Sequence, residues 1–257
     1  MNDATPRAPL VLERLQEAAG PRWQVHLHAE AESTNALAAT TPEPGLVVVA
    51  DHQTAGRGRL GRTWVTPEGA ALTFSAVVDP GLDDEWWPLL PLVAGYAVAR
   101  TVGGSLKWPN DVLLGGRKVC GILVERVHVR GRGADTPLAV VGIGLNVDQT
   151  SDELPVPTAT SLALETGPRD RTELFGELLD QLRTGLDAAV RSPGDTLRDY
   201  RGLCDTLAQE VRVELPGGET LEGRAVDVDE HGRLVVENAE GTVVVAAGDV
   251  VHVRPSE

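Results

Sequence analysis

Lysine is almost absent from this chain of 257 residues. The sequence has 23 lysines and arginines together, but Lys107 and Lys118 are the only lysines. Most surface positions accept either residue, so a lysine that persists among arginines marks a place where a compact, flexible cation is hard to replace. Such a cation can follow a phosphate or a carboxylate as a point charge. The pair therefore indicates an anion site, and chance is the alternative explanation.

Cysteine and long apolar runs are also scarce. Cys120 and Cys204 form no Cys-x-x-Cys pair, which excludes a disulfide framework and a cysteine-rich metal site. Both are expected to be small core or surface residues in a reducing compartment. No stretch approaches the roughly 20 apolar residues that a membrane span needs. Residues 1–10 lack the apolar core of a signal peptide, so the expected location is the cytoplasm.

Positive charge is scarce overall but concentrated in one place. The net charge of −15 argues against a protein whose whole surface serves nucleic acid. Between Arg57 and Arg62, however, three arginines occur without an acidic residue. An acidic protein that gathers its arginines in one segment is expected to bind an anion there.

The apolar periodicity predicts an α+β fold followed by a small β domain. Helices are expected over residues 9–19, after Ser33 as N-cap, over 85–101 and over 172–190. Strands are expected over residues 45–52, 71–78, 106–114, 118–130 and 138–147. In the strand 71–78, Phe74 and Ser75 are expected on opposite faces. The first 32 residues are too short for a helix-turn-helix domain.

The character of the sequence changes after residue 208. Short strands separated by glycine turns are expected over residues 211–215, 221–228, 233–237 and 242–253. The segment contains no helix signal and has the length of a small β-barrel. The sequence therefore predicts two domains, residues 1–208 and residues 209–257.

The first candidate site is the segment from Gly56 to Arg62, here called the Gly–Arg loop. Its glycines allow the backbone to approach a ligand closely, and its arginines offer forked donors to phosphate or carboxylate. A solvated basic loop is one alternative, and a DNA minor-groove arm is another that the acidic composition disfavours. Trp64, which follows, could stack on a base, but taken alone it is expected in the core.

The second candidate site is Lys107-Trp-Pro-Asn-Asp111. Pro109 removes a backbone donor and marks an edge or an irregular strand end. The lysine, the amide of Asn110 and the carboxylate of Asp111 together suit a triphosphate and its Mg²⁺. An ordinary Asn-Asp turn after proline explains the same residues equally well.

Two glycine-containing strands complete the pattern. Lys118 begins an apolar strand in which Gly121 permits close approach of a ligand, and the motif runs from Lys118 to Glu125. Gly142-Ile-Gly-Leu-Asn146 leaves room above the sheet and ends in an amide. Taken separately, each strand is most simply an ordinary part of a sheet.

In combination and in this order, these motifs closely resemble the biotin–protein ligase family. The resemblance rests on Ser33-Thr-Asn35, on residues 53–64, on Lys107-Trp-Pro-Asn-Asp111, on Lys118 with Gly121, and on residues 142–146. It covers nearly the whole chain and matches the short form without an N-terminal DNA-binding domain. It implies a class II synthetase-like catalytic domain, in which helices back a mixed sheet, and a C-terminal SH3-like β-barrel.

The resemblance also implies an activity. Members of that family join biotin and ATP into biotinyl-5′-AMP and then transfer biotin to a lysine of a carboxyl carrier domain. ATP and biotin are thus expected substrates, Mg²⁺ is expected, and no membrane or nucleic-acid partner is expected. The oligomeric state is open between a monomer and a weak homodimer.

The residues of this chain divide by implied role, and several serve more than one substrate. Lys118, Arg57 and Asp111 are the implied catalytic residues, whereas the ligands of any metal remain unknown. Biotin is expected to contact Ser33, Thr34, Asn35, Gln53, Gly56, Arg57, Arg59, Lys118, Gly121 and Gly144. ATP is expected to contact Arg59, Arg62, Trp64, Lys107, Asn110, Asp111, Lys118 and Asn146.

Two other functions remain open on the sequence alone. A lipoate–protein ligase would also adenylate a cofactor acid, but the Gly–Arg loop with Trp64 favours biotin. A biotin-sensing regulator that binds DNA is a candidate from a different class. The net charge of −15 and the missing N-terminal domain disfavour that regulator.

Overall fold

The computed structural model describes residues 7–128 and 137–252. The described chain divides into two compact units. The first unit holds residues 1–79 and 117–180, and the second holds residues 80–116 and 181–257. Within these described ranges, no helix is long and apolar enough to cross a membrane.

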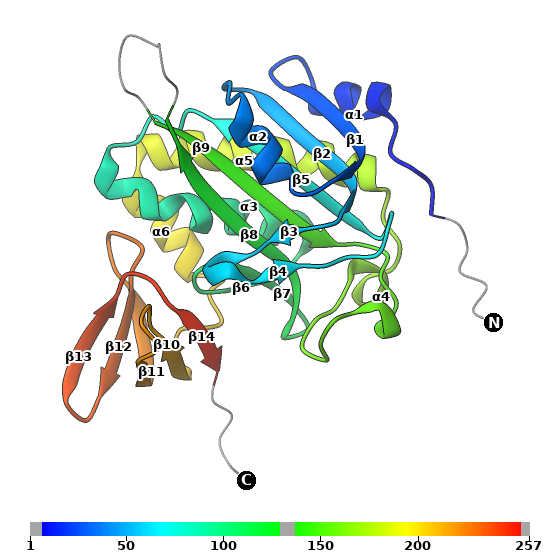
Figure 1. Ribbon diagram of the computed structural model, residues 1–257. Helices are drawn as coiled ribbons and strands as arrows, with labels where there is room; N and C mark the ends of the chain where they lie inside the picture. The colour runs from blue at the N-terminus through cyan, green and yellow to red at the C-terminus, as the bar shows by residue number, and fades with distance from the viewer. Residues whose placement is uncertain (1–6, 129–136, 253–257) are drawn as a thin grey trace. The chain divides into compact units, whose positions relative to one another are not determined.

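The first unit is built on a mixed sheet (Figure 1). Its strands follow one another in the order β1 (Gln24–Ala31), β2 (Leu46–Gln53), β5 (Ala71–Val78), β9 (Leu138–Asn146) and β8 (Arg117–Val127). The pair β1–β2 is parallel, whereas β2–β5, β5–β9 and β8–β9 are antiparallel. The predicted α+β class with a mixed sheet is confirmed.

Helices back this sheet, as predicted, and they cover both of its faces. Helix α2 (Thr34–Thr40) begins at the N-cap Ser33 and packs on an apolar cluster that includes Val48, Val77 and Val140. On the opposite face, Phe175 of α5 (Arg171–Arg191) meets Phe74 edge-on at 5.2 Å between ring centroids. The predicted alternation in residues 71–78 therefore places Phe74 in the apolar core and Ser75 on the side of α2.

The remaining elements of the first unit are short, apart from α1 (Leu12–Ala19). The Gly–Arg loop lies within a hairpin of β3 (Gly56–Arg57) and β4 (Thr63–Trp64), closed by the 3₁₀ turn η1 (Arg59–Gly61). The chain beyond β9 contains the turn η3 (Ser151–Glu153) and the helix α4 (Leu162–Glu165). The hairpin was not foreseen from the sequence, which predicted only a loop over residues 53–64.

The second unit contains its own sheet and helices. The turn η2 (Asp84–Leu89) and the helix α3 (Leu90–Val102) replace the single helix predicted over 85–101, because Pro88 interrupts regular hydrogen bonding. The helix α6 (Pro193–Arg201) follows α5 and was missed.

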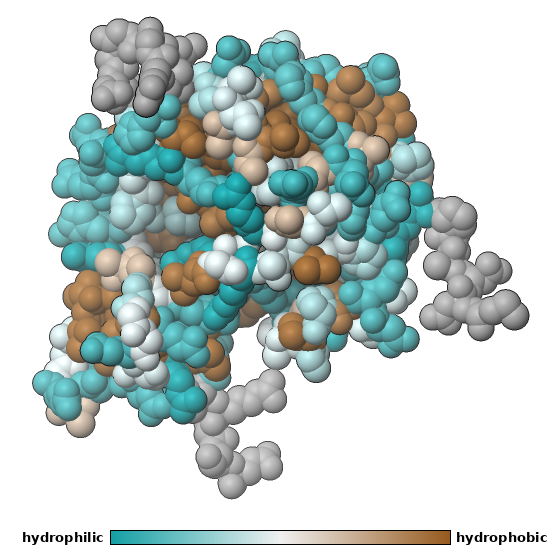
Figure 2. All heavy atoms as spheres, in the orientation of Figure 1, coloured by the Kyte–Doolittle hydropathy of each residue, from teal (hydrophilic) through white to brown (hydrophobic). Residues whose placement is uncertain are grey.

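Polar side chains predominate on the molecular face drawn in Figure 2, and apolar residues lie there in separate groups.

Two strand predictions in the second unit are wrong. Residues 106–114 form an antiparallel hairpin of β6 (Ser105–Lys107) and β7 (Asp111–Leu114), joined by a turn that contains a cis Trp108–Pro109 bond. The predicted strand 242–253 is divided into β13 (Gly241–Val245) and β14 (Asp249–His252). The segment between them includes Gly248, where a Cβ would lie 2.6 Å from Val213.

The C-terminal β segment is otherwise confirmed. Its antiparallel sheet has the order β13, β12 (Leu234–Asn238), β11 (Thr220–Val228), β10 (Glu210–Glu214) and β14. Alternate residues such as Val211, Val213 and Val236 are buried, which explains the period-two apolar pattern of the sequence.

Candidate active site

Three glycines leave part of one face of the first unit's sheet without side chains. Gly142 pairs with Ser75 on β5, and Gly144 pairs with Gly121 on β8. Directly paired residues point to the same face, so Gly121, Gly142 and Gly144 lie on the face that α2 partly covers. This group of three is here called the glycine floor.

Trp64 and Lys118 lie on the glycine floor. A Cβ at Gly144 would be 2.6 Å from the Trp64 ring, and a Cβ at Gly121 would be 3.4 Å from Nζ of Lys118. The Lys118 ammonium is 5.6 Å from the centroid of the Trp64 ring, within the range of a cation–π interaction. Trp64 is half-buried on the sheet face, so the expectation of a core position is wrong.

The indole N–H of Trp64 is a buried donor without a hydrogen-bond partner among the described residues. Buried polar groups in proteins are generally satisfied by protein, water or ligand. An aromatic plane that also presents such a donor beside a lysine suits a ligand that carries both an apolar part and an acceptor.

The polar end of this face is a connected set of buried side chains. Gln53 Oε1 accepts hydrogen bonds from the backbone N of Thr34 at 2.8 Å and from Thr34 Oγ1 at 3.2 Å. Ser75 Oγ is 2.8 Å from Thr34 Oγ1 and 2.5 Å from Asn35 Oδ1, and both are possible acceptors of its proton. Gly142 is required here, because a Cβ would clash with the Asn35 amide. The structure thus brings Thr34, Asn35 and Gln53 together.

Ser33 and the Gly–Arg loop have local structural roles as well. The side chain of Ser33 accepts from the backbone N of Ala36 at 3.4 Å and caps α2. A Cβ at Gly56 would clash with the backbone oxygen of Trp64, which explains glycine at that position. Arg59 and Arg62 flank a turn in which Leu60 takes a left-handed conformation with φ of 56°. Such a conformation is unfavourable for leucine by about 1 kcal/mol or more.

Asn146 is fixed at both ends of its amide. Its Nδ2 donates to the backbone oxygen of Thr160 at 2.9 Å, and its Oδ1 accepts from Nε2 of Gln149 at 2.9 Å. Both amide side chains are buried. Sequence reasoning missed Gln149 because nothing in Asn-Val-Asp-Gln signals that its side chain folds back onto Asn146.

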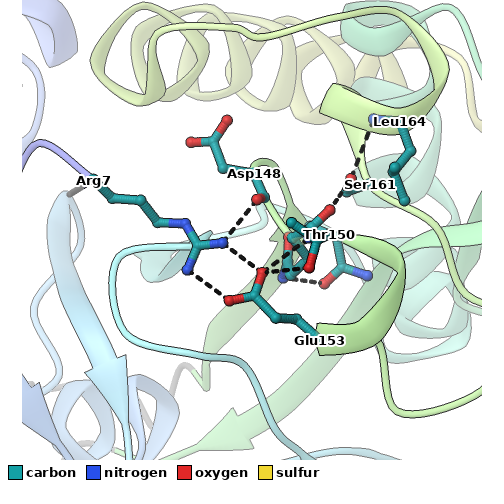
Figure 3. Close-up of polar contacts among 8 residues, drawn as sticks. Arg7, Asp148, Thr150, Glu153, Ser161 and Leu164 are labelled. Carbon is teal, nitrogen blue, oxygen red and sulfur yellow. Dashed lines mark hydrogen bonds and ion pairs between the residues drawn. The ribbon is translucent and has the colours of Figure 1, made fainter. Parts of the chain in front are cut away.

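Arg7 holds the chain that follows Asn146 (Figure 3). Its two terminal nitrogens donate to Glu153 at 3.1 and 2.5 Å, and Nη2 also donates to the backbone oxygen of Asp148 at 2.9 Å. Glu153 accepts in turn from the backbone N of Thr150, which completes a capping box. The hydrogen bond from Arg7 is the main cause of the lowered pKa of Glu153.

Lys107, Asn110 and Asp111 belong to the second unit. Lys107 and Asp111 are cross-strand partners in the β6–β7 hairpin, and Nζ is 4.0 Å from the Asp111 carboxylate. Between them, the buried Trp108 donates through Nε1 to the backbone oxygen of Gly232 at 2.9 Å. The hairpin that carries the cation and the carboxylate is therefore anchored by the C-terminal β segment.

No group of three or more His, Cys, Asp and Glu residues in the described part of the chain could hold a metal ion. Nucleotide-bound Mg²⁺ needs only one or two protein carboxylates, because phosphates and water supply the other ligands. The largely buried Asp111 carboxylate is compatible with that requirement.

His252 provides a pH test of the same part of the second unit. Burial and the nearby Lys107 lower the pKa of His252, while Asp205 opposes the shift. As the pH falls below 6.5, the His252 imidazole is therefore protonated in the unfolded chain before it is protonated in the folded chain. The contribution of His252 to the free energy of unfolding should decrease from about pH 6.5 downward and level off below the folded-state pKa of this residue. In urea titrations at several pH values, His252→Gln should reduce this slope, and an unchanged slope would contradict the assignment.

Models of two protein families match two separate parts of the chain. The model of the Biotin/lipoate A/B protein ligase family matches residues 28–146, and that of the Biotin protein ligase C terminal domain matches residues 206–253. The biotin–[acetyl-CoA-carboxylase] ligase of Mycobacterium tuberculosis is 39% identical, over 96% of this chain and 97% of that protein. The bifunctional ligase/repressor BirA of Bacillus spizizenii is 30% identical over 89% of this chain and 72% of its own length.

A solved structure gives the same result. The biotin protein ligase of Aquifex aeolicus in complex with biotin and ATP superimposes with a TM-score of 0.76 and 29% identity. The match covers 90% of this chain and 98% of that one. This chain belongs to the biotin–protein ligase family.

Proposed function

We propose that this chain is an ATP-dependent biotin–[acetyl-CoA-carboxylase] ligase. A carboxylate oxygen of biotin attacks the α-phosphorus of ATP, pyrophosphate leaves and biotinyl-5′-AMP forms. The amine of one carrier lysine then attacks the acyl carbon, an amide forms and AMP leaves. The observation that carries the proposal is the packing of Trp64 and Lys118 on the glycine floor. This packing places a flat apolar surface beside the Lys118 ammonium.

The residues of the first unit divide between biotin and the adenylate in this proposal. The connected polar set of Thr34, Asn35 and Gln53, with Ser33, binds the ureido head of biotin. Lys118 bridges the biotin carboxylate and the α-phosphate. Seven other residues serve as the covering loop, the phosphate and adenine contacts and the floor: Gly56, Arg57, Arg59, Arg62, Trp64, Gly121 and Gly144.

The charges of these residues fit the reaction. A carboxylate and a triphosphate repel each other until fixed cations neutralise both, so positioning and electrostatic stabilisation carry the rate. Lys107, Asn110, Asp111 and Asn146 serve the triphosphate, its Mg²⁺ or the incoming lysine in this scheme. Bound Mg²⁺ would neutralise phosphate charge, with Asp111 as its candidate protein ligand.

The partner is proposed from the relatives. The acceptor is a biotin carboxyl carrier protein, and we propose a cytoplasmic location and no nucleic-acid partner. We also propose that residues 1–208 form the catalytic domain and residues 209–257 the C-terminal domain, because the strands after residue 208 form an antiparallel sheet of their own.

Mass measurement of an apo-carrier domain tests the activity. After incubation with the chain, ATP, Mg²⁺ and biotin, the carrier should gain the mass of one biotinyl group. Replacing biotin with lipoate should give no gain. Labelling with lipoate alone would establish a lipoate ligase instead, and no gain with either acid would overturn the proposal.

Replacement of Arg59 tests the Gly–Arg loop. Loss of charge-assisted hydrogen bonds to a phosphate should speed the dissociation of biotinyl-AMP by about ten- to a hundredfold in Arg59→Gly. Dissociation can be followed by rapid filtration with labelled adenylate. Arg212→Ala, which removes only an exposed ion pair with Glu222, is the matched control. Adenylate retention equal to that control would refute the covering role.

A further inference from the structure

The Glu125 carboxylate bridges two parts of the candidate site that are far apart in the sequence. Its Oε1 accepts a hydrogen bond from Nη1 of Arg57 at 3.2 Å, and its Oε2 accepts from Nδ2 of Asn35 at 2.7 Å. Arg57 belongs to the Gly–Arg loop, and Asn35 lies in the first turn of α2. The sequence pattern contains Glu125 only as the last residue of the motif that begins at Lys118.

Glu125 determines which way the Asn35 amide points. Nδ2 of Asn35 faces two acceptors, the Glu125 carboxylate at 2.7 Å and the backbone oxygen of Leu123 at 3.3 Å. Its Oδ1 lies 2.5 Å from the hydroxyl of Ser75. A reversed amide would set its oxygen against both acceptors, so the observed orientation is strongly favoured.

Hydrogen bonds connect the oriented Asn35 amide to the other side chains at the polar end of the glycine floor. Ser75 also contacts Thr34 Oγ1 at 2.8 Å, and Thr34 donates to Gln53. Glu125 is thus connected through Asn35 to the side chains proposed to bind the biotin head. Its other oxygen connects the same network to the loop proposed to cover the ligand.

The ion pair between Glu125 and Arg57 contributes little to folding. The Arg57 side chain is 48% exposed and that of Glu125 is 33% exposed. Exposed pairs of this kind have small effects on stability because water and salt screen them. An effect of Glu125 on ligand binding would therefore come from the geometry that it imposes on Asn35 and Arg57.

We propose that Glu125 is a positioning residue of the biotinylation reaction. It fixes the Asn35 amide beside the biotin head and holds Arg57, so that occupation of the biotin pocket and closure of the Gly–Arg loop are coupled. This proposal rests on the proposed function of the chain.

Two substitutions separate the two contacts. Glu125→Gln keeps an oxygen that can accept from Asn35 but removes the charge that holds Arg57, whereas Glu125→Ala removes both contacts. Glu125→Gln should raise the dissociation rate of biotinyl-AMP by about three- to tenfold and leave KM for biotin unchanged. Glu125→Ala should in addition raise KM for biotin by about tenfold. KM for ATP should remain that of the wild type in both variants.

A double variant tests whether Glu125 acts through Arg57. If it does, Arg57→Gln combined with Glu125→Gln should release biotinyl-AMP no faster than Arg57→Gln alone, because the contact is already lost. Fully additive effects would overturn the coupling. The exposed Glu222→Gln is the control and should leave every constant unchanged.

Thermal unfolding separates positioning from folding. A variant with a lowered Tm but wild-type KM and adenylate dissociation would show a merely structural role and overturn the proposal. If both Glu125 variants match the wild type, the proposal fails while the ligase function stands. If the wild type itself forms no biotinyl-AMP, the proposed function fails and this proposal with it.

Discussion

Replacing Lys118 with alanine is expected to slow the formation of biotinyl-AMP by about 100- to 1,000-fold. The Lys118 ammonium lies over the Trp64 ring and close to Gly121, where the two reacting anions meet in the proposed mechanism. Without that charge, the carboxylate and the α-phosphate would repel each other as they approach. Pyrophosphate release under saturating biotin and ATP measures the rate.

Lys118→Arg provides the matched comparison. Arginine keeps the positive charge but has a planar, rigid group that cannot occupy the same point. An intermediate rate is expected, with the Tm of both variants near that of the wild type. Pyrophosphate release at the wild-type rate in Lys118→Ala would remove this residue from the reaction.

Replacing Arg171 with alanine is expected to destabilise the chain by about 3–5 kcal/mol. Arg171 is only 6% exposed. Its guanidinium donates to the Asp51 carboxylate at 2.7 Å and to the backbone oxygens of Ala71 at 3.1 Å and Ala8 at 2.6 Å. Alanine would leave the largely buried Asp51 carboxylate and the buried backbone oxygen of Ala71 without this donor. Urea denaturation followed by circular dichroism gives the free energy of unfolding.

Arg14→Ala is the control for Arg171. Arg14 forms an ion pair with Asp170 at 3.3 Å, but both side chains are exposed, so a change within about 0.5 kcal/mol is expected. Arg171→Ala with the stability of that control would refute the anchoring role. Because Ala71 pairs with Asn146, the destabilised variant should also weaken the strand end that carries this amide.

Local signals predicted the elements of the fold that depend on near neighbours. Ser33 caps α2 as its sequence suggested, and the leucine repeat of α5 matches the observed helix. The alternation of Phe74 and Ser75 correctly assigned the two faces of β5. In each case the deciding interaction is an apolar face or a hydrogen bond within four residues.

Other elements gave too weak a signal. The strand β1 (Gln24–Ala31) was missed because it alternates His and Glu with apolar residues, and only Val25 and Ala31 of it are buried. The helix α6 begins with the N-cap Ser192 and Pro193 at its first position, a signal that could have revealed it. Residues 106–114 were predicted as one strand because the two short strands have similar compositions and the turn at Pro109 between them was not recognised.

The sequence singled out the residue types of the candidate site but not the contacts between them. The motifs located Lys118, Trp64 and the glycines, since each is unusual in its local context. The roles of Ser75, Glu125 and Gln149 depend on contacts between residues that are brought together by the register of the strands or by a segment that folds back on the strand before it. A slip of one residue would turn Ser75 away from Asn35, and no local pattern reports the register. The predicted end of the strand 118–130 falls outside the described residues.

The glycine floor owes its shape to missing methyl groups, and this makes it a place for redesign. A new methyl at Gly144 would press into the Trp64 ring at 2.6 Å, whereas one at Gly121 would approach the same ring at 3.1 Å and needs only a small shift. Gly121→Ala is therefore the milder way to raise this floor. A ligase altered in this way would favour a slimmer acid over the natural one, and could label a chosen target with a synthetic tag alongside the unmodified enzyme.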